Sequence, residues 1–364
     1  MKPSLLQLIA LATFSFCLFP AAVAGFGSGD EAERPTNGSD VVVTVDDLRR
    51  LGLPKLNKTC RDYYQSGADQ EQTLHENTAA FKRWRLLYRV LVDVLSRSTR
   101  TTMLGQEVSM PLGIAPSAMQ KMAHRDGEKG TAVASQDAGT VMILSTLSST
   151  SIEDLRAAAP NATLWLQLYV FKNRTVTEEL LHRAYCANFS AVVLTVDAPT
   201  WGQRIVDVRN AFTIPEGITL GNFDRSVYSN FDMTNATSGS GLTRYTNDFF
   251  DQSLTWKDVL WLKNVTSLPV VLKGIMSPED AQLAVHYGVQ AIIVSNHGGR
   301  QLDGVPSTRR FNEYRPAFQG TDGVRKMLDI FLTEINRTLA LMGHSSVHTF
   351  KPQDLIRQER YGLL

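Results

Sequence analysis

The stretch AIIVSNHGGRQLD, residues 291–303, indicates the fold and holds the densest cluster of chemically reactive side chains in the chain. It begins with an apolar, β-branched run, Ala291–Val294, which predicts a buried strand. A polar cluster follows, in which two glycines between His297 and Arg300 allow a sharp turn and close approach to a ligand. Histidine exchanges a proton near neutral pH, and arginine can clamp a carboxylate through two parallel hydrogen bonds. The stretch therefore indicates chemistry beside an acid group, rather than a structural turn with a hydrogen-bonded histidine.

Short apolar runs alternate with amphipathic segments of helix length over most of the chain. Six runs are expected strands: Pro111–Ala115, Val141–Leu144, Leu164–Leu168, Ala191–Val196, Pro269–Leu272 and Ala291–Val294. Ser277 as N-cap and Pro278 as first helical residue open the last of the expected helices, which are Gly127–Ala138, Ser151–Ala159, Val176–Ala187 and Ser277–Tyr287. This alternation predicts parallel strands with right-handed crossovers, in a doubly wound sheet or a TIM barrel. No G-x-G-x-x-G follows the first run, which argues against a Rossmann domain.

Hydrogen-bonding or reactive residues stand at the end of every run. Their repetition favours the TIM barrel over the doubly wound sheet. The carboxyl ends of barrel strands meet at one rim, so these residues are expected to converge on one site. They are Ala115, Pro116, Ser117 and Ala118, then Ser145, Gln167, Tyr169, Thr195, Asp197, Lys273, Ser295, His297 and Arg300. We therefore predict an α/β fold of the TIM (β/α)8 type. Residues 210–252 lack periodicity and are expected to form a long loop or lid.

The run SNHGGRQLD and the upstream Tyr63-Tyr64-Gln65-Ser66-Gly67-Ala68 closely resemble the signatures of the FMN-dependent 2-hydroxy-acid oxidase and dehydrogenase family, which includes glycolate oxidase. The resemblance spans about Thr44 to Ser307. It implies a barrel that holds FMN at its mouth and oxidises an (S)-2-hydroxy acid to a 2-oxo acid. Dioxygen, reduced to hydrogen peroxide, is the expected acceptor. Another acceptor stays open, as does hydride against carbanion transfer.

The resemblance also implies roles for single residues. His297 would be the catalytic base, with Asp197 supporting it and Tyr169 meeting the substrate. The residues expected to bind the substrate are Tyr63, Tyr169, Arg204 and Arg300. Those expected to contact FMN are Ala115, Pro116, Ser117, Ala118, Ser145, Gln167, Thr195, Lys273 and Ser295. Leu147 stands where short-chain members often carry a large aromatic residue, so we expect room for a longer aliphatic acid.

The chain departs from the family after Ser307. A (β/α)8 barrel needs eight strands, and only six are recognisable. The family motifs Asp-Gly-Gly-x-Arg-Arg-Gly and Gly-Arg, which bind the flavin phosphate, are absent, and the resemblance resumes only in a final helix, Gly323 to Gly343. About two βα units, on the order of 50–60 residues, are therefore expected to be missing near 308–315 of a domain spanning 44–364.

Such a barrel is expected to expose unpaired strand edges and to lack the usual phosphate cradle. The alternatives to an active oxidase are a truncated isoform, or an inactive secreted glycoprotein, that cannot hold FMN. A third possibility is a phosphate site rebuilt from Arg309, Arg310, Arg315 and Arg325.

The N-terminus resembles a targeting segment. Lys2 precedes an apolar run that ends at the small-residue motif Ala22-Val23-Ala24, so residues 1–24 are expected to be a signal peptide and 25–43 a linker. The apolar run is short for a membrane span, and we expect none after cleavage. Eight N-x-[ST] sequons agree with passage to the cell exterior or a vesicular lumen: Asn37, Asn57, Asn161, Asn173, Asn188, Asn235, Asn264 and Asn336.

The composition is that of an ordinary globular protein. Of 364 residues, 43% are hydrophobic and 20% charged, with a formal net charge of +1, so nothing favours nucleic-acid binding. Whether Cys60 and Cys186 pair stays open. No C-x-x-C or His-Glu ligand spacing occurs, so we predict no metal. The small-molecule partners expected are the 2-hydroxy acid and dioxygen, and a homo-oligomer is possible.

Overall fold

The computed structural model describes residues 41–223, 240–308 and 320–361. The predicted signal peptide, almost all of the linker, two sequons and three arginines of the possible phosphate site lie outside these ranges. Those residues are Asn37, Asn235, Arg309, Arg310 and Arg315.

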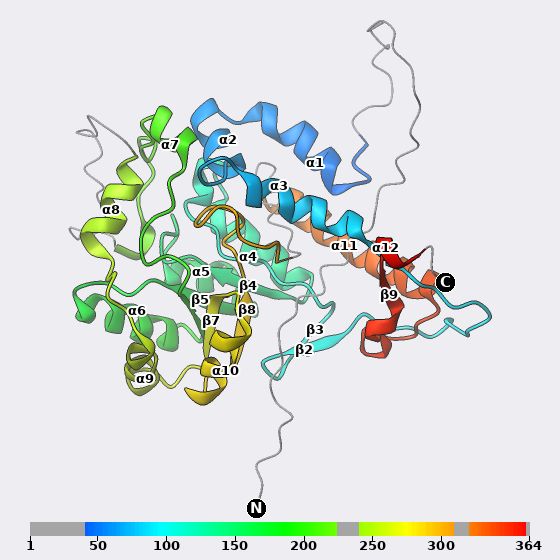
Figure 1. Ribbon diagram of the computed structural model, residues 1–364. Coiled ribbons are helices and arrows are strands. Elements are labelled where there is room, and N and C mark those ends of the chain that lie inside the picture. Colours follow the sequence, from blue (N-terminus) through cyan, green and yellow to red (C-terminus); the bar gives the residue numbers. More distant parts are fainter. Residues whose placement is uncertain (1–40, 224–239, 309–319, 362–364) are drawn as a thin grey trace, which may run out of the picture.

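A five-stranded parallel sheet forms the centre of the molecule, with its strands in sequence order (Figure 1). The strands are β4 (Val141–Leu144), β5 (Thr163–Leu168), β6 (Ala191–Thr195), β7 (Val270–Ile275) and β8 (Ala291–Val294). Helices alternate with them along the chain: α4 (Gly127–Asp137), α5 (Ile152–Ala158), α6 (Arg174–Cys186), α9 (Trp256–Val265) and α10 (Pro278–His286). This order is that of βα units, and it confirms five of the six predicted strands and all four predicted helices.

The prediction of a first strand over Pro111–Ala115 is wrong in extent. The segment makes a single parallel bridge, between Ile114 and Met142. The Ile114 amide donates to the Val141 carbonyl at 2.8 Å, and the Ile143 amide donates to the Ile114 carbonyl at 3.0 Å. Pro111 has no amide hydrogen to extend this pairing.

The sheet is a half-barrel, open as the sequence predicts. Within the described ranges, β8 pairs only with β7, and no strand follows it in this sheet. The predicted final helix is present as α11 (Gly320–Met342), which packs against α4. Its buried side chains Val324, Leu328 and Leu339 form a cluster with Leu48 and Ala134. The last helix thus packs on the barrel's first helix although the described ranges hold no further strand of this sheet between β8 and α11.

The two faces of the sheet bury different side chains because side chains alternate along a strand. The inner face carries Val141, Ile143, Trp165, Ala191, Val193, Val271, Ala291 and Ile293. The hairpin of β2 (Thr101–Met103) and β3 (Gln106–Val108) packs its Met103 and Val108 into the same cluster. The outer face, including Leu144, Leu166, Leu194 and Leu272, belongs to the larger core that the helices share.

Capping residues define the first turns of two helices, and the second of these starts where the sequence predicts. Thr44 accepts from the Asp47 amide, and Asp47 accepts from the Thr44 amide, so α1 (Val45–Gly52) begins with a capping box. Ser277 accepts from the Asp280 amide at the start of α10, where Pro278 is the first helical residue.

Short elements complete the described structure. The helices α2 (Lys58–Gln65) and α3 (Gln72–Ala79) reach the carboxyl ends of the sheet strands, where Tyr63 and Leu74 line a pocket. The remaining helices and strands are α7 (Ile205–Arg209), α8 (Gly241–Phe249), α12 (Gln358–Tyr361) and the antiparallel pair β1 (Trp84–Leu86) and β9 (Leu355–Arg357). Single 3-10 turns are η1 (Leu53–Lys55), η2 (Ala80–Arg83), η3 (Gln120–Met122), η4 (Gly221–Phe223), η6 (Val347–Thr349) and η7 (Pro352–Asp354).

Two further sequence expectations are settled by these elements. The loop predicted over 210–252 is wrong at its end, where α8 packs Leu242 and Tyr245 into the main core. Cys60 and Cys186 do not pair, because Cys60 is buried with its thiol donating to the Met122 carbonyl while Cys186 is exposed. None of the helices in the described ranges is both long and apolar enough for a membrane crossing.

Candidate active site

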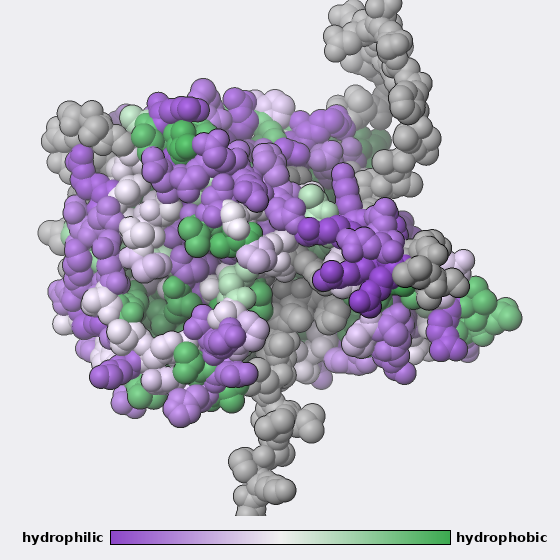
Figure 2. Space-filling model, in the orientation of Figure 1, coloured by the Kyte–Doolittle hydropathy of each residue, from purple (hydrophilic) through white to green (hydrophobic). Residues whose placement is uncertain are grey.

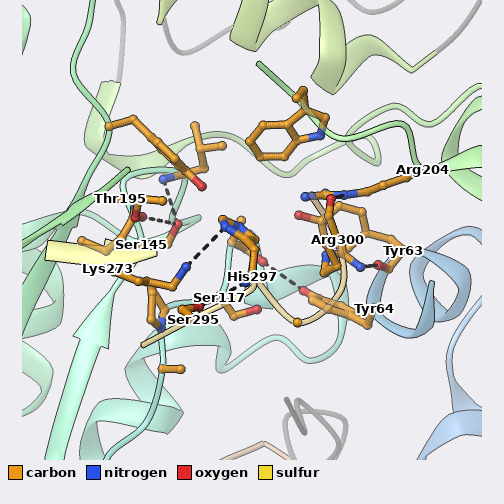
Figure 3. A pocket seen from close by; sticks show the side chains of 18 of the residues that line it. Tyr63, Tyr64, Ser117, Ser145, Thr195, Arg204, Lys273, Ser295, His297 and Arg300 are labelled. Atoms are coloured by element: carbon orange, nitrogen blue, oxygen red, sulfur yellow. Dashed lines mark hydrogen bonds between the residues drawn. The ribbon is translucent and has the colours of Figure 1, made fainter. Parts of the chain in front are cut away.

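A pocket opens at the carboxyl ends of the strands (Figure 3). Every residue predicted to bind substrate or FMN lines it, as does His297. Asp197 is the one predicted site residue that does not, and it contacts His297 instead. Side chains alternate between the two faces of a strand, and this alternation explains why many predicted residues meet in the pocket. The inner-face residues Ile143, Trp165 and Val193 are each followed, two positions later, by a residue that lines the pocket. The residues delivered in this way are Ser145, Gln167, Thr195, Lys273 and Ser295.

Three of these side chains form a hydrogen-bonded row across neighbouring strand ends. The Ser145 hydroxyl donates to Gln167 Oε1 at 3.4 Å, and Gln167 Nε2 donates to Thr195 Oγ1 at 3.0 Å. All three side chains are buried. Buried polar groups that are held by one another form a rigid edge with defined donors and acceptors.

His297 lies between this polar row and two arginines, as Figure 3 shows. Its Nδ1 lies 2.7 Å from Asp197 Oδ1 and 3.3 Å from Lys273 Nζ. The short contact with a carboxylate assigns the imidazole proton to Nδ1, which leaves the Nε2 lone pair as the basic atom. Lys273 Nζ lies 3.6 Å from Asp197 Oδ2, so the three groups form one ionic cluster.

The charges within this cluster follow from burial and proximity. Burial alone would raise the pKa of Asp197, but His297 and Lys273 lower that pKa to about 2. Burial lowers the pKa of His297 to about 4, with Asp197 opposing and Lys273 reinforcing the shift. Asp197 is therefore ionised and His297 neutral at neutral pH, which is the state a proton acceptor needs.

The backbone at His297 is in the left-handed region, with φ +56°, and Gly298 and Gly299 follow at φ +72°. A non-glycine residue in this region is strained, and such strain concentrates at functional sites. Surrounding contacts hold the turn: the His297 amide donates to Ser295 Oγ, and the Gly298 amide donates to Asn296 Oδ1, both at 3.1 Å. A Cβ at Gly299 would lie 2.6 Å from the Leu74 amide nitrogen, so only glycine fits there.

Two guanidinium groups line the opposite side of the pocket, and each lies over an aromatic ring. Arg300 Nη1 donates to the carbonyls of Tyr63 and Ser66 at 2.6 and 2.7 Å, with its guanidinium 4.9 Å from the Tyr63 ring centroid. Arg204 lies 4.4 Å from the Trp201 ring centroid. Burial, followed by repulsion from Arg300, lowers the pKa of Arg204 to about 10, so Arg204 is charged at neutral pH.

Several lining residues were not predicted as site residues. Tyr64 donates its hydroxyl to the Met119 carbonyl at 2.9 Å and lines the pocket together with Ser66, Leu74, Trp201 and Gly298. Tyr64 and Ser66 belong to the family-like motif Tyr63–Ala68, so the sequence did contain a signal that could have identified them. Trp201 lies in the loop after Asp197, where no periodicity indicates which way a side chain points.

Residues 54–313 match a protein-family model described as FMN-dependent dehydrogenase. The chain belongs to this family. A 2-hydroxyacid oxidase of Dictyostelium discoideum is 47% identical over 281 residues, which cover 77% of this chain and 71% of the relative. Glycolate oxidase 3 of Arabidopsis thaliana is 44% identical over 318 residues, covering 85% of this chain and 84% of the relative.

Solved structures agree with the sequence relatives. The crystal structure of a mandelate oxidase with (S)-4-hydroxymandelic acid superposes with a TM-score of 0.78 at 30% identity, covering 86% of this chain and 98% of the other. The protein is therefore an FMN-dependent enzyme of the 2-hydroxy-acid oxidase type, and FMN is its cofactor.

The ring end of FMN fits this pocket. The polar edge of a flavin ring alternates hydrogen-bond donors and acceptors, and the Ser145–Gln167–Thr195 row offers both, with the Lys273 cation beside it. The phosphate end of FMN has fewer potential partners. Within the described ranges, the pocket lining holds no glycine-rich backbone cradle. Arg325, proposed for a rebuilt phosphate site, is paired with Asp137 at 2.5 Å and Asp322 at 2.7 Å.

Proposed function

We propose that this FMN-dependent dehydrogenase family member oxidises an (S)-2-hydroxy acid to the 2-oxo acid, with dioxygen as acceptor and hydrogen peroxide as second product. The observation that carries the proposal is the neutral His297, paired with Asp197 at 2.7 Å, facing the same pocket as Arg204 and Arg300. The balance is R–CHOH–COO⁻ + O2 → R–CO–COO⁻ + H2O2, so the substrate loses two protons and two electrons.

The chain's own groups account for substrate binding and proton transfer. Arg204 and Arg300 bind the substrate carboxylate, since a guanidinium has five donor hydrogens and the two carbonyl bonds of Arg300 leave others available. This anchoring brings C2 and its hydroxyl to His297, whose Nε2 takes a proton. Asp197 stabilises the resulting imidazolium, and Lys273 offsets negative charge that develops near the polar row. FMN, held beside the Ser145–Gln167–Thr195 row and Lys273, would supply the two-electron redox chemistry that links the substrate to dioxygen.

The tyrosines complete the proposed contacts. Tyr169 is buried and stacked on Phe250, with ring centroids 4.7 Å apart, and burial raises its pKa. It therefore stays protonated and can donate a hydrogen bond to a substrate oxygen. Tyr63 stacks on Phe212 at 4.7 Å, which fixes its ring beside Arg300.

Leu147 supports a longer aliphatic substrate. Its side chain lines the pocket and is 1% exposed, so it presents a buried aliphatic surface. We expect 2-hydroxyoctanoate to be turned over with a higher kcat/KM than glycolate, because each buried CH₂ contributes about 0.8 kcal/mol. Faster turnover of glycolate would contradict this assignment.

Peroxide formation tests the reaction as a whole. The FMN-loaded protein is mixed with 2-hydroxyoctanoate in air, and 2-oxo acid and hydrogen peroxide are both measured. Equal amounts of the two products are expected from the (S) enantiomer and none from the (R) enantiomer. Formation of the 2-oxo acid only when a quinone or cytochrome replaces dioxygen would identify a dehydrogenase. A colourless protein that does not take up FMN would favour the inactive alternative.

We also propose that the protein enters the secretory pathway, which is supported by the leader-like residues 1–24 and by its sequons. Five sequon asparagines are exposed: Asn57, Asn161, Asn173, Asn188 and Asn264. Expression in a eukaryotic host should give a mature N-terminus at Gly25 and a mass that falls on treatment with a glycosidase. An intact leader and an unchanged mass would reject secretion. Homo-oligomer formation stays a prediction.

A further inference from the structure

We propose that Trp201 is a positioning and specificity residue, whose indole supports the guanidinium of Arg204 and forms a wall against the C2 substituent of the substrate. This inference rests on the proposed function, because it assumes that the arginine pair binds the carboxylate. Trp201 lines the pocket together with Arg204, His297 and Tyr169.

The two arginines of the pocket are held in different ways. Arg300 is fixed by the carbonyls of Tyr63 and Ser66, at 2.6 and 2.7 Å. Among the described residues, the hydrogen bond found for the Arg204 side chain is a long one, 3.5 Å from Nε to the Arg300 carbonyl. The indole of Trp201 lies 4.4 Å from the Arg204 guanidinium carbon, within the range of a cation–π interaction. The orientation of Arg204 therefore depends on Trp201 more than that of Arg300 depends on any single side chain.

The indole also borders the space where a substrate side chain would lie. Its ring lies 6.4 Å from the His297 ring at 71° and 6.2 Å from the Tyr169 ring at 65°, both edge-on. A substrate whose carboxylate is bound by Arg204 and whose C2 atom lies at His297 has its C2 substituent next to Trp201. Trp201 is the residue that contacts both Arg204 and His297. With Leu147 in the same pocket, this wall suits an extended apolar substituent better than the hydrogen of glycolate.

The loop that carries Trp201 is bound to the turn that carries His297 and Arg300. Gln301 Oε1 accepts from the Gly202 amide at 3.1 Å, and Gln301 Nε2 donates to the Thr200 carbonyl at 2.9 Å. A Cβ at Gly202 would collide with the Arg300 carbonyl and lie 2.6 Å from Gln301 Cα. The backbone on both sides of Trp201 is thus fixed against the catalytic turn, which holds the indole over the pocket.

The test compares Trp201→Leu and Trp201→Phe with a matched control. Trp261 makes a similar pair with Arg174, at 4.5 Å, and neither residue lines the pocket, so Trp261→Leu removes a cation–π contact elsewhere. Binding of glyoxylate and 2-oxooctanoate to the FMN-loaded proteins is measured by calorimetry, which needs no turnover. KM and kcat with 2-hydroxyoctanoate are measured in parallel.

Trp201→Leu should weaken glyoxylate binding by about 2- to 30-fold, which is the fold-change for a cation–π contact of about 0.5–2 kcal/mol. The loss should be larger for 2-oxooctanoate, and KM should rise more than kcat falls. Trp201→Phe should restore most of the affinity, and Trp261→Leu should bind both acids as the unaltered protein does. Unchanged binding of both acids by Trp201→Leu would overturn the inference alone. Failure of the unaltered protein to bind either acid would overturn the proposed function and the inference with it.

Discussion

The acid–base chemistry of this protein depends on Asp197 and Lys273, the two charged side chains that contact His297. Its Nδ1 contacts an ionised carboxylate at 2.7 Å and an ammonium group at 3.3 Å, so two opposite charges act on one ring. Burial adds to the effect of Lys273, and together they outweigh Asp197. The base is thus held neutral but close to a carboxylate that favours its protonation during the reaction.

The pH dependence of kcat/KM tests this charge state. His297 accepts a proton only when neutral, and its pKa is lowered to about 4. We expect kcat/KM to be flat near neutral pH and to fall as the pH drops through about 4, instead of near the ordinary histidine value. Asp197→Asn removes a group that raises this pKa, so the acid limb should move to lower pH. An acid limb near pH 6.5 in the unaltered protein would contradict the assignment.

Sequence reasoning reached most residues of the site but not all. The strand-end residues Ser145, Gln167 and Thr195 are predictable, because alternation along a strand fixes the face of every second side chain. Asp197 and Arg300 also stand at strand ends in the sequence, whereas Tyr63 and Arg204 came only from the resemblance to a family. Trp201 was beyond both approaches, since the direction of a loop side chain depends on contacts such as those of Gln301.

At the scale of elements, close approach between neighbouring strand ends sets the geometry of the ionic cluster. Gly274, next to Lys273 on β7, has φ +116°, and a Cβ there would lie 2.6 Å from the Asp197 Cβ and 2.7 Å from its amide nitrogen. The carboxylate reaches His297 because β7 carries no side chain at this position. Glycine is needed here for both its conformation and its size.

Gly274→Ala should therefore impair both stability and catalysis. We expect a loss of about 1–3 kcal/mol in the free energy of unfolding, together with a marked fall in kcat because Asp197 is displaced from His297. Gly217→Ala is the control, since Gly217 has φ +80° with no atom within 4 Å of an added Cβ. Urea unfolding and steady-state kinetics measure the two effects. Equal kcat values for both variants would show that Gly274 does not position Asp197.

The loops at the strand ends are joined by a buried carboxylate. Glu128 of α4 is fully buried and accepts from the amides of Gln120 and Ser149 and from the hydroxyls of Ser149 and Thr150, at 2.7 to 2.9 Å. Four donors to one carboxylate satisfy its lone pairs without a cation. Glu128 thus connects the Ser117–Met122 region to the loop after β4.

Glu128→Ala should destabilise the protein by about 3–5 kcal/mol, because it leaves several buried donors without an acceptor. The measurement is the free energy of urea unfolding. Glu153→Ala is a suitable comparison, since Glu153 is 53% exposed in its ion pair with Arg183 and should contribute about 1 kcal/mol or less. Similar losses in the two variants would contradict the role assigned to Glu128.

Elements were predicted more reliably where periodicity was strong. The strands β4 and β8 have the predicted bounds, and the four helices begin or end within two residues of prediction. The prediction for Pro111–Ala115 was wrong because the segment pairs through a single bridge, between Ile114 and Met142, and Pro111 has no amide hydrogen to extend it. The helix α8 was missed because glycine and serine precede it, while its burial depends on tertiary contacts that no local pattern reports.

At the scale of the whole molecule, the half-barrel leaves apolar surface exposed. Val294 on β8 is 37% exposed, and Leu302, in the turn that follows, is 70% exposed. Figure 2 shows a further hydrophobic projection at the right-hand side, formed by the exposed side chains of residues 88–95. These surfaces belong to a sheet that has five strands in the described ranges, where a complete barrel has eight.

The open barrel predicts how the protein discriminates between flavins. Its polar row would contact the flavin ring, but the described pocket offers no phosphate cradle, so FMN and riboflavin should bind with similar affinities. Charge-assisted hydrogen bonds contribute about 1.5–3 kcal/mol each, so a rebuilt phosphate site would favour FMN by more than tenfold. Titrations of flavin fluorescence measure both constants. A strong preference for FMN would show that residues outside the described ranges bind the phosphate.

A chimera supplies the complementary experiment. The segment between Ser307 and Gly320 is replaced by the corresponding segment of the Dictyostelium discoideum 2-hydroxyacid oxidase. FMN affinity should rise more than tenfold while riboflavin affinity changes little, because only FMN carries the phosphate. Equal gains for both flavins would mean that the added units stabilise the barrel without recognising phosphate.

The most direct test of the account is anaerobic reduction of the bound flavin. The protein, saturated with FMN, is mixed with an (S)-2-hydroxy acid in the absence of oxygen, and the visible flavin absorbance is followed. We expect this absorbance to bleach, and to bleach about 10²–10⁴-fold more slowly in His297→Gln. Equal rates in the two proteins, or bound flavin that stays oxidised in the unaltered protein, would contradict the assignment of His297 as the base of a working site.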